Sequence, residues 1–394
     1  MNNIKFAAKI VDKGTNSSGR FLILDHTEFC PDGKGGQLGD RGFIGNSNVI
    51  KVLESTDNII FHYVDQYPDS DTVECKIDGV RRKDISIQHT AQHILSQSFL
   101  QLFNIETIGF HMGEDYTTVD LNIDKMNEDL IFKAEDLANE IVLENRLVKK
   151  YFVSESELQN LSIRKKGDIK GNIRIVEIKD FDLSMCGGTH VDSTGEIGLI
   201  KIIKQEKLKK IYTRFYFVAG LRALRNYRER ARILSNISQL LTAGEEEIFY
   251  KLQNLIEENK ALIKENRIQR EKLFEHLVKD FVKRAEQIGK IKFVFEVLDD
   301  YSRDDISLLG KILSSEEKLV ALILSRENNL FGALIAGIGV ILDFDAIREG
   351  LNNFIMRSWG NKNFIFFEFK NEISTENINN LIKEQLKKSS LRII

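Results

Sequence analysis

The chain has 394 residues, of which 42% are apolar, 29% are charged and only two are proline. This composition is typical of folded globular domains and excludes long disordered or proline-rich linkers. The formal net charge of −3 excludes a general electrostatic attraction to nucleic acid, so RNA binding would have to come from local basic patches. Three cysteines in a chain of this length exclude a disulfide framework.

The amino-terminal residues lack the apolar stretch and the small-residue cleavage site of a secretory signal. The longest apolar run, residues 333–342, is shorter than the roughly 20 residues that cross a bilayer. We therefore expect a cytoplasmic protein with no membrane partner. We also expect more than one domain, because single cores rarely grow beyond roughly 250 residues.

The first half of the chain predicts two units. Residues 1–85 contain short alternating apolar segments between glycine- and aspartate-containing turns, which indicates a β-rich, barrel-like unit. Residues 86–221 combine helical spacing over 87–103, a second helix at about 128–144 and several strand-like segments. This pattern predicts an α/β domain, and the strand that ends at Gly220 favours a boundary there.

The second half predicts a helical linker followed by another α/β domain. Residues 222–290 are read as long, coiled-coil-like helices, because they contain no proline and carry a helical seam at Ile248, Leu252, Leu255 and Leu262. Polar Asn259 and Asn266 interrupt the seam, which favours an intramolecular hairpin and leaves a homodimer through this region open. Residues 291–394 alternate strand and helix patterns, so the whole chain is expected to be an α+β protein.

Two short segments carry side chains that suit a metal ion. His89 and His93 stand at positions i and i+4 of a predicted helix, so both imidazoles project from one face. Further along, Cys186 and His190 flank three small residues, Gly187, Gly188 and Thr189, that let the backbone curl and aim both side chains inward. Three nitrogens and one sulfur suit tetrahedral zinc, so we predict that these four residues bind Zn²⁺.

A zinc protease would also use two histidines at this spacing. Such an enzyme needs a glutamate directly after the first histidine as general base. That position is Thr90, which cannot act as the base. The sequence therefore excludes the protease interpretation and requires another kind of zinc site.

Together the motifs resemble the alanyl-tRNA editing proteins, the AlaX-type relatives of the editing part of alanyl-tRNA synthetase, in their long form with an added C-terminal domain. The resemblance covers about the first 220 residues and follows the paired histidines and the segments 24–32, 35–42, 109–113, 186–190 and 193–198. The loop 29–37 is one residue longer than the family pattern, and Cys30 stands where an aromatic residue is common. In the C-terminal domain, similar to a tRNA-binding domain of alanyl-tRNA synthetases, the glycine cluster is reduced to Ser-Trp-Gly-Asn-Lys-Asn at 358–363.

The resemblance implies a zinc-dependent hydrolase that removes a wrong amino acid, serine or else glycine, from tRNA(Ala). Such an enzyme is needed because a small apolar pocket cannot strongly reject an amino acid that merely adds a hydroxyl. The family pattern begins near residue 24, so we expect a free-standing editing protein without an aminoacylation domain. The alternative is a noncatalytic zinc-containing tRNA-binding or regulatory protein that keeps the fold but has lost hydrolysis.

The resemblance and the charge pattern also suggest residues for the substrate. Candidates for a polar pocket around the amino acid are Thr27, Gln37, Gln92 and His111, together with the Gly187, Gly188 and Thr189 segment. A basic stretch near residue 220 is a candidate for contacting tRNA phosphates. Its candidate residues are Lys209, Lys210, Arg214, Arg222 and Arg225.

Overall fold

The computed structural model describes residues 4–164, 171–209, 211–326, 330–361, 363–370, 374–388 and 392–393. The chain divides into two compact units, Met1–Leu240 and Leu241–Ile394. Each unit has its own hydrophobic cores. In the described part of the chain no helix is long and apolar enough to cross a membrane.

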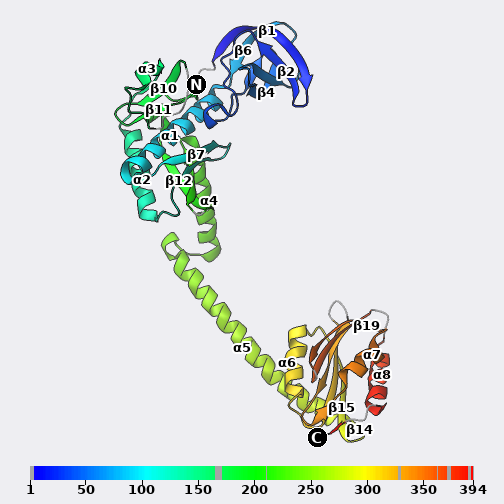
Figure 1. Ribbon diagram of the computed structural model, residues 1–394. Helices are drawn as coiled ribbons and strands as arrows, with labels where there is room; N and C mark the ends of the chain where they lie inside the picture. Colours follow the sequence, from blue (N-terminus) through cyan, green and yellow to red (C-terminus); the bar gives the residue numbers. More distant parts are fainter. Residues whose placement is uncertain are drawn as a thin grey trace. The chain divides into compact units, whose positions relative to one another are not determined.

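The first unit begins with a closed barrel of six strands in the order β1-β2-β5-β4-β3-β6 (Figure 1). Alternate residues of β6 point into its core, where Val73, Cys75 and Ile77 are buried, because successive strand residues face opposite sides. The predicted barrel-like unit is thus confirmed. The elements are β1 (Lys5–Asn16), β2 (Gly19–Leu24), the 3₁₀ turn η1 (Lys34–Gly36), β3 (Gly42–Ile44), β4 (Ser47–Glu54), β5 (Ile60–Val64) and β6 (Thr72–Ile77).

Helix α1 (Gly79–Phe103) follows the barrel directly and begins eight residues before the predicted start at residue 87. Its N-cap is Asp78, whose side chain accepts hydrogen bonds from the backbone N–H groups of Val80 and Arg81. The first two turns carry charged residues without an apolar repeat, so their helical periodicity is not visible in the sequence. The capping carboxylate stabilises this start, because it satisfies N–H groups that lack helical partners.

The remainder of the first unit packs α1 and α2 against a four-stranded sheet, β12-β13-β8-β7, with a second sheet, β11-β10-β9, beside them (Figure 1). Phe99 of α1 and Phe215 of β13 meet in the shared core, with ring centroids 5.3 Å apart. The elements are β7 (Thr107–Met112), β8 (Thr117–Leu121), α2 (Glu128–Leu143), β9 (Val148–Val153), α3 (Glu155–Leu158), β10 (Ile173–Ile178), β11 (Asp182–Met185), η2 (Thr194–Ile197), β12 (Ile200–Lys209), β13 (Tyr212–Ala219) and α4 (Leu221–Leu241).

The second unit is a six-stranded sheet, β14-β15-β16-β17-β20-β19, in which only β15 and β16 run parallel among the described strand pairs. One face packs against α7 and α8 and the other against α6 and the end of α5. The elements are η3 (Glu245–Glu247), α5 (Ile248–Lys283), β14 (Glu286–Ile288), β15 (Ile291–Asp299), α6 (Arg303–Leu313), β16 (Leu319–Arg326), β17 (Leu330–Ala336), β18 (Val340–Ile341), α7 (Phe344–Leu351), β19 (Ile355–Asn361), β20 (Phe364–Phe369), α8 (Thr375–Lys388) and β21 (Arg392–Ile393).

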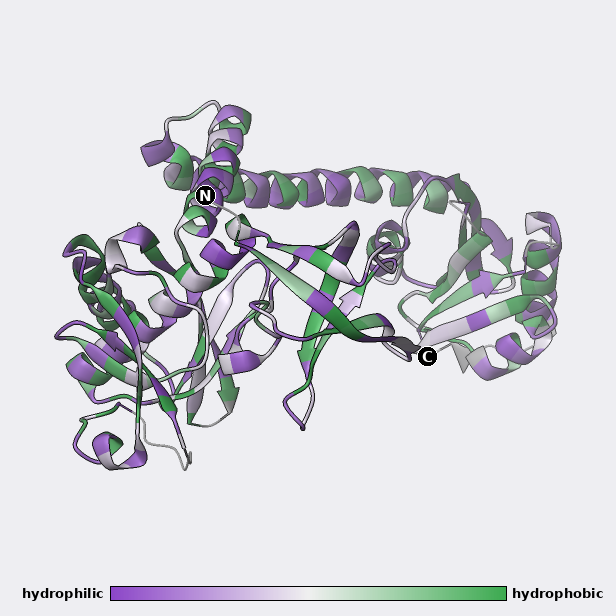
Figure 2. Ribbon diagram, turned by 90° about the horizontal axis from the view of Figure 1, so that it is seen from above, coloured by the Kyte–Doolittle hydropathy of each residue, from purple (hydrophilic) through white to green (hydrophobic). Residues whose placement is uncertain are grey.

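Helix α5 has 36 residues and carries the predicted apolar seam. Hydrophobic and hydrophilic residues alternate along it (Figure 2). Leu252, Leu255 and Leu262 of the seam are exposed. The helix ends at Lys283 and β14 begins at Glu286, so the end of the segment predicted as helical over 222–290 instead adds an edge strand to the sheet.

The barrel contains a buried histidine whose ionisation affects stability. His62 of β5 is fully buried, and its Nδ1–H donates to the Leu22 carbonyl oxygen while Nε2 lies 2.8 Å from Thr27 Oγ1. Burial lowers the pKa of His62 to about 4, although the bond to Leu22 acts against this shift. The folded protein therefore favours the neutral ring.

We predict that this histidine destabilises the first unit in mild acid. Between pH 6.5 and about 4 the unfolded chain binds a proton that the folded chain does not, so the free energy of unfolding falls as pH decreases, by about 3 kcal/mol in total. Denaturant unfolding of wild type and His62→Gln at pH 7 and pH 4.5 measures the effect. The wild type should lose more stability than the variant, and an equal loss in both proteins contradicts the prediction.

Candidate metal and substrate site

Helix α1 supplies two imidazoles to the centre of the first unit. His89 and His93 lie one turn apart, are both buried, and have ring centroids 5.3 Å apart. Phe110 of β7 stacks on the His89 ring at 5.3 Å. The helical spacing and this packing hold both rings on the same side of α1.

The loop after β11 supplies the other two side chains, Cys186 and His190. Arg174 of β10 fixes its path, because one guanidinium nitrogen donates to the carbonyl oxygens of Cys186 and Gly188, both at 2.8 Å. Gly188 is required by close packing, since a Cβ atom there would lie 2.2 Å from Cε1 of His89. A Cβ atom on Gly187 would meet nothing closer than 3.9 Å.

These elements bring four potential ligands together. The ligand atoms of His89, His93, Cys186 and His190 all lie within 4.8 Å of one another. The Cys186 Sγ atom lies 3.3 Å from Nε2 of His89 and 3.3 Å from Nε2 of His190. Three imidazoles and one thiol in so small a volume could hold a tetrahedral metal ion.

Each imidazole also has a second partner that orients its ring. All three use Nδ1 for a hydrogen bond with a neighbouring side chain, which leaves Nε2 facing the cluster. The partners are Gln37 for His89 (2.8 Å), Asp182 for His93 (2.9 Å) and Thr90 for His190 (3.2 Å). Partners of this kind set the tautomer and direction of metal-binding histidines.

The charges in the cluster favour a thiolate beside a cation. Burial raises the pKa of Cys186, but the facing imidazoles outweigh it and lower that pKa far below its ordinary value. Burial lowers the pKa of His93, but the hydrogen bonds and negative charges of Asp182 and Cys186 together outweigh burial and raise this pKa to about 9. For His89 and His190, burial prevails and lowers the pKa. Without an ion, His93 carries the positive charge next to the thiolate, and a metal ion can supply the same charge.

Sequence reasoning missed the residues that support His93. Asp182 is 89 positions away from it, and its carboxylate also accepts a hydrogen bond from Arg164 Nε at 2.7 Å and from Ser184 Oγ. The hydrogen bonds and positive charges of His93 and Arg164 together outweigh burial and lower the Asp182 pKa to about 2. No short motif connects these residues, so only the folded chain reveals them.

A cavity of about 320 Å³ reaches the cluster, and three of the four clustered side chains form part of its wall. Ile108 and Phe110 give the wall an apolar side. Gln92 gives the wall a polar side. Its Nε2 donates a hydrogen bond to Ser96 Oγ at 2.7 Å, and Ser96 Oγ also accepts one from Thr107 Oγ1 at 2.8 Å. The side-chain carbonyl oxygen of Gln92 makes no hydrogen bond with described residues, so it can accept a hydrogen bond from a ligand.

Two other predicted pocket residues lie away from this cavity. Thr27 bonds to His62 in the barrel and is not among the described residues that line the cavity. His111 is exposed on β7, and it follows Phe110, whose side chain stacks on the cluster. Neighbouring strand residues face opposite sides, so His111 points away from the cluster.

Gln37 and Thr189 support the cluster rather than the cavity. The Gln37 carbonyl oxygen accepts hydrogen bonds from His89 Nδ1, from the Thr189 backbone N–H at 2.8 Å and from Thr189 Oγ1 at 3.3 Å. Neither Gln37 nor Thr189 is among the described lining residues. Their contacts therefore hold ligands in position.

The basic candidates have different surroundings. Arg222 is buried and makes ion pairs with Asp84 of α1, so it holds α4 against α1 and is not presented to a phosphate. Arg214 pairs with Asp120 on the neighbouring strand. Arg225 is exposed, with no ion pair in the described part of the chain. Lys210 and the side chain of Lys209 lie outside the described residues.

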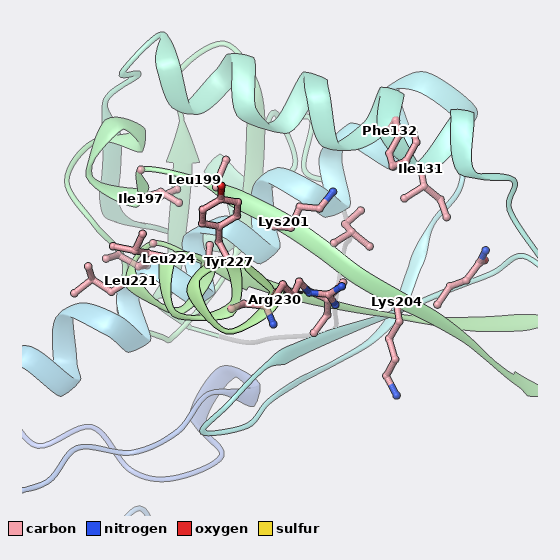
Figure 3. Close-up of a pocket in the computed structure, with 18 of the residues that line it drawn as sticks. Ile131, Phe132, Ile197, Leu199, Lys201, Lys204, Leu221, Leu224, Tyr227 and Arg230 are labelled. Atoms are coloured by element: carbon pink, nitrogen blue, oxygen red, sulfur yellow. Dashed lines mark hydrogen bonds between the residues drawn. The ribbon is translucent and has the colours of Figure 1, made fainter. Parts of the chain in front are cut away.

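A larger groove of about 910 Å³ lies between α2, β12 and α4 (Figure 3). Its wall is mainly apolar, with Lys201, Lys204 and Arg230 among its polar residues. None of the four clustered residues lines it. Chemistry that needs a metal ion or a polar pocket therefore belongs to the smaller cavity. The labelled apolar residues are Ile131, Phe132, Ile197, Leu199, Leu221 and Leu224.

Comparisons with known proteins agree with this site. Residues 173–216, which include Cys186 and His190, match the family described as threonyl and alanyl tRNA synthetase second additional domain. An alanine–tRNA ligase of Sulfurisphaera tokodaii is 30% identical over 339 residues, 82% of this chain and 36% of the ligase. The chain thus spans about a third of the length of the ligases it matches. The C-Ala domain structure from Aquifex aeolicus alanyl-tRNA synthetase covers 26% of this chain and 97% of its own, at 18% identity and a TM-score of 0.24, from which nothing further follows.

A relative of similar length gives the most direct assignment. The alanyl-tRNA editing protein AlaX-L of Pyrococcus horikoshii is 30% identical over 345 residues, which cover 84% of both chains. The match extends across both units of the structure rather than over one motif. The resemblance predicted from the sequence is confirmed, and the chain belongs to the AlaX-L type of alanyl-tRNA editing proteins.

Proposed function

We propose that this protein is a free-standing hydrolase that cleaves the ester between tRNA(Ala) and a wrongly attached small amino acid, with serine as the main substrate. The observation that carries the proposal is the cavity whose wall contains three of the four clustered ligands. In a chain of the AlaX-L type, a ligand cluster open to a cavity supports chemistry on a bound substrate. A catalytic zinc ion keeps a coordination position for water or substrate, so an ion held by all four residues would act on the ester by releasing one ligand or by accepting a fifth.

We propose Zn²⁺ as the resident ion, held by His89, His93, Cys186 and His190. The donor set fits, because three Nε2 atoms and one thiolate converge and every Nδ1 has another partner. Zinc bound there would supply a positive charge that polarises or positions the ester group. The protein groups keep this site rigid, so little reorganisation is needed when substrate enters.

Specificity for serine is proposed to depend on Gln92. Its free carbonyl oxygen can accept a hydrogen bond from a serine hydroxyl, while Ser96 holds its amide nitrogen. Alanine has no hydroxyl and would leave this oxygen without a partner in a cavity closed by substrate. An unsatisfied polar group of this kind costs about 1–3 kcal/mol, which favours serine over correctly attached alanine.

Affinity for the body of the tRNA is proposed to come from exposed cations outside the cavity. Arg225 and Arg228 are exposed on α4, and neither makes an ion pair with a described residue. Contacts of this type bind phosphates without reading sequence. Arg222 is left out of this surface because it is buried against Asp84.

The first prediction from this proposal is that the purified, zinc-loaded protein releases serine from Ser-tRNA(Ala) without ATP. The ester bond is already activated, so water and a site that orients it suffice. Loss of acid-precipitable labelled serine measures the reaction. If the tRNA stays charged over a range of protein concentrations, the protein is instead a noncatalytic tRNA-binding or regulatory protein.

The second prediction compares two neighbouring glycines. Gly188→Ala places a Cβ atom against His89 and should lower bound zinc to well below one equivalent, whereas Gly187→Ala has room for its Cβ atom and should keep the metal. Elemental analysis of both purified proteins measures the difference. Equal zinc contents in the two variants would contradict the close packing on which the assignment rests.

The third prediction concerns substrate choice. Gln92→Leu keeps the approximate volume of the side chain but removes the carbonyl oxygen from the cavity. The ratio of kcat/KM for Ser-tRNA(Ala) to that for Ala-tRNA(Ala) should fall by about 5- to 150-fold, which corresponds to a loss of about 1–3 kcal/mol. Zinc content should not change. An unchanged ratio would show that another group reads the serine hydroxyl.

A further inference from the structure

Lys34 lies at the edge of the cavity. It belongs to η1, the turn in the lengthened loop 29–37, and it is followed by Gly35, which lines the cavity. Its side chain passes close to Gly187, because a Cβ atom on that glycine would lie 3.9 Å from Lys34 Cε. Gly187 is exposed and also lines the cavity, so Lys34 places a positive charge beside the opening.

Lys34 makes an ion pair with Glu54, but this pair contributes little to the stability of the fold. Its Nζ lies 3.1 Å from Glu54, and both side chains are partly open to solvent. Exposed pairs of this kind contribute little to stability. A phosphate can therefore replace Glu54 as partner at small cost.

Arg174 supplies a second cation beside Gly187. One of its guanidinium nitrogens holds the carbonyl oxygens of Cys186 and Gly188, on either side of Gly187. Its other N–H groups make no hydrogen bond with described residues, and no described carboxylate pairs with it. Burial raises the pKa of Cys30 to about 11, and the charges of Lys34 and Arg174 both act against that rise, so both cations lie around Cys30.

We propose that Lys34 and Arg174 form an anion-binding pair that takes a backbone phosphate of the 3′-terminal nucleotides of tRNA. This inference rests on the proposed function, in which the ester at the RNA 3′ end lies in the cavity. The last phosphate is then only one sugar away from the ester and must pass the edge of the cavity. A guanidinium with unused N–H groups and an ammonium on a long, flexible side chain are the groups that proteins use for such phosphates.

The test uses uncharged tRNA(Ala), so that it does not require hydrolysis. Affinity of the full-length protein is measured against salt concentration, with intact tRNA and with tRNA that lacks its last three nucleotides. For Lys34→Gln, intact tRNA should bind several-fold more weakly at low salt. The slope of log affinity against log salt should become shallower by about 0.7, the value for one phosphate contact on a single strand.

Lys13→Gln is the matched control, because Lys13 also makes an exposed 3.1 Å ion pair on the barrel, with Asp71, but neither of its neighbours in the chain lines the cavity, whereas Lys34 is followed by Gly35, which does. It should bind both RNAs as wild type does. The shortened tRNA should not distinguish Lys34→Gln from wild type. The proposal is overturned if Lys34→Gln binds intact tRNA with the affinity of wild type. It is also overturned if the substitution lowers the affinity for shortened tRNA as much as the affinity for intact tRNA. If Lys34→Gln has the shallower slope but the wild-type protein hydrolyses no ester, the phosphate contact stands and the proposed function is refuted.

Discussion

One buried hydrogen-bond acceptor connects the parts from which the site is built. The carbonyl oxygen of Gln37 accepts hydrogen bonds from His89 on α1 and from the backbone and side chain of Thr189 in the loop after β11. Gln37 itself follows η1, in the long connection between β2 and β3 of the barrel. One amide group therefore joins three segments. Each buried donor that is left without this acceptor would lower the stability of the fold by about 1–3 kcal/mol. The direction of the His89 ring depends on this junction.

The second constraint is electrostatic. A buried thiolate is stable only beside positive charge, and a buried carboxylate needs the same. The positively charged His93 lies between Cys186 and Asp182 and stabilises the negative charge of each. Arg164 also donates a hydrogen bond to the Asp182 carboxylate. The cluster is thus prepared for a cation. A divalent ion would replace the His93 proton and leave Asp182 to hold the ring.

Two hollows of the first unit, the larger groove and the smaller cavity at the cluster, differ in what they could bind. The larger groove is mostly apolar and contains no clustered ligand, whereas the smaller cavity joins the metal cluster to a free amide oxygen and an apolar wall. A small polar amino acid in ester linkage suits the second hollow. Size alone would have favoured the first one, so the chemistry of the wall is the better guide to function.

The sequence by itself predicted the β-rich barrel, the helices of the second half and the four residues whose ligand atoms meet in the structure, because these depend on local periodicity and on two short motifs. Local patterns could not predict the early start of α1, which depends on the Asp78 cap, or the edge strand after α5. Local patterns also could not show which candidate residues reach the cavity and which are used in other contacts. Gln92 faces the cavity, Gln37 supports a ligand, His111 points away and Arg222 is buried in an ion pair. Only the tertiary structure decided these roles, because each one depends on contacts between residues far apart in the chain.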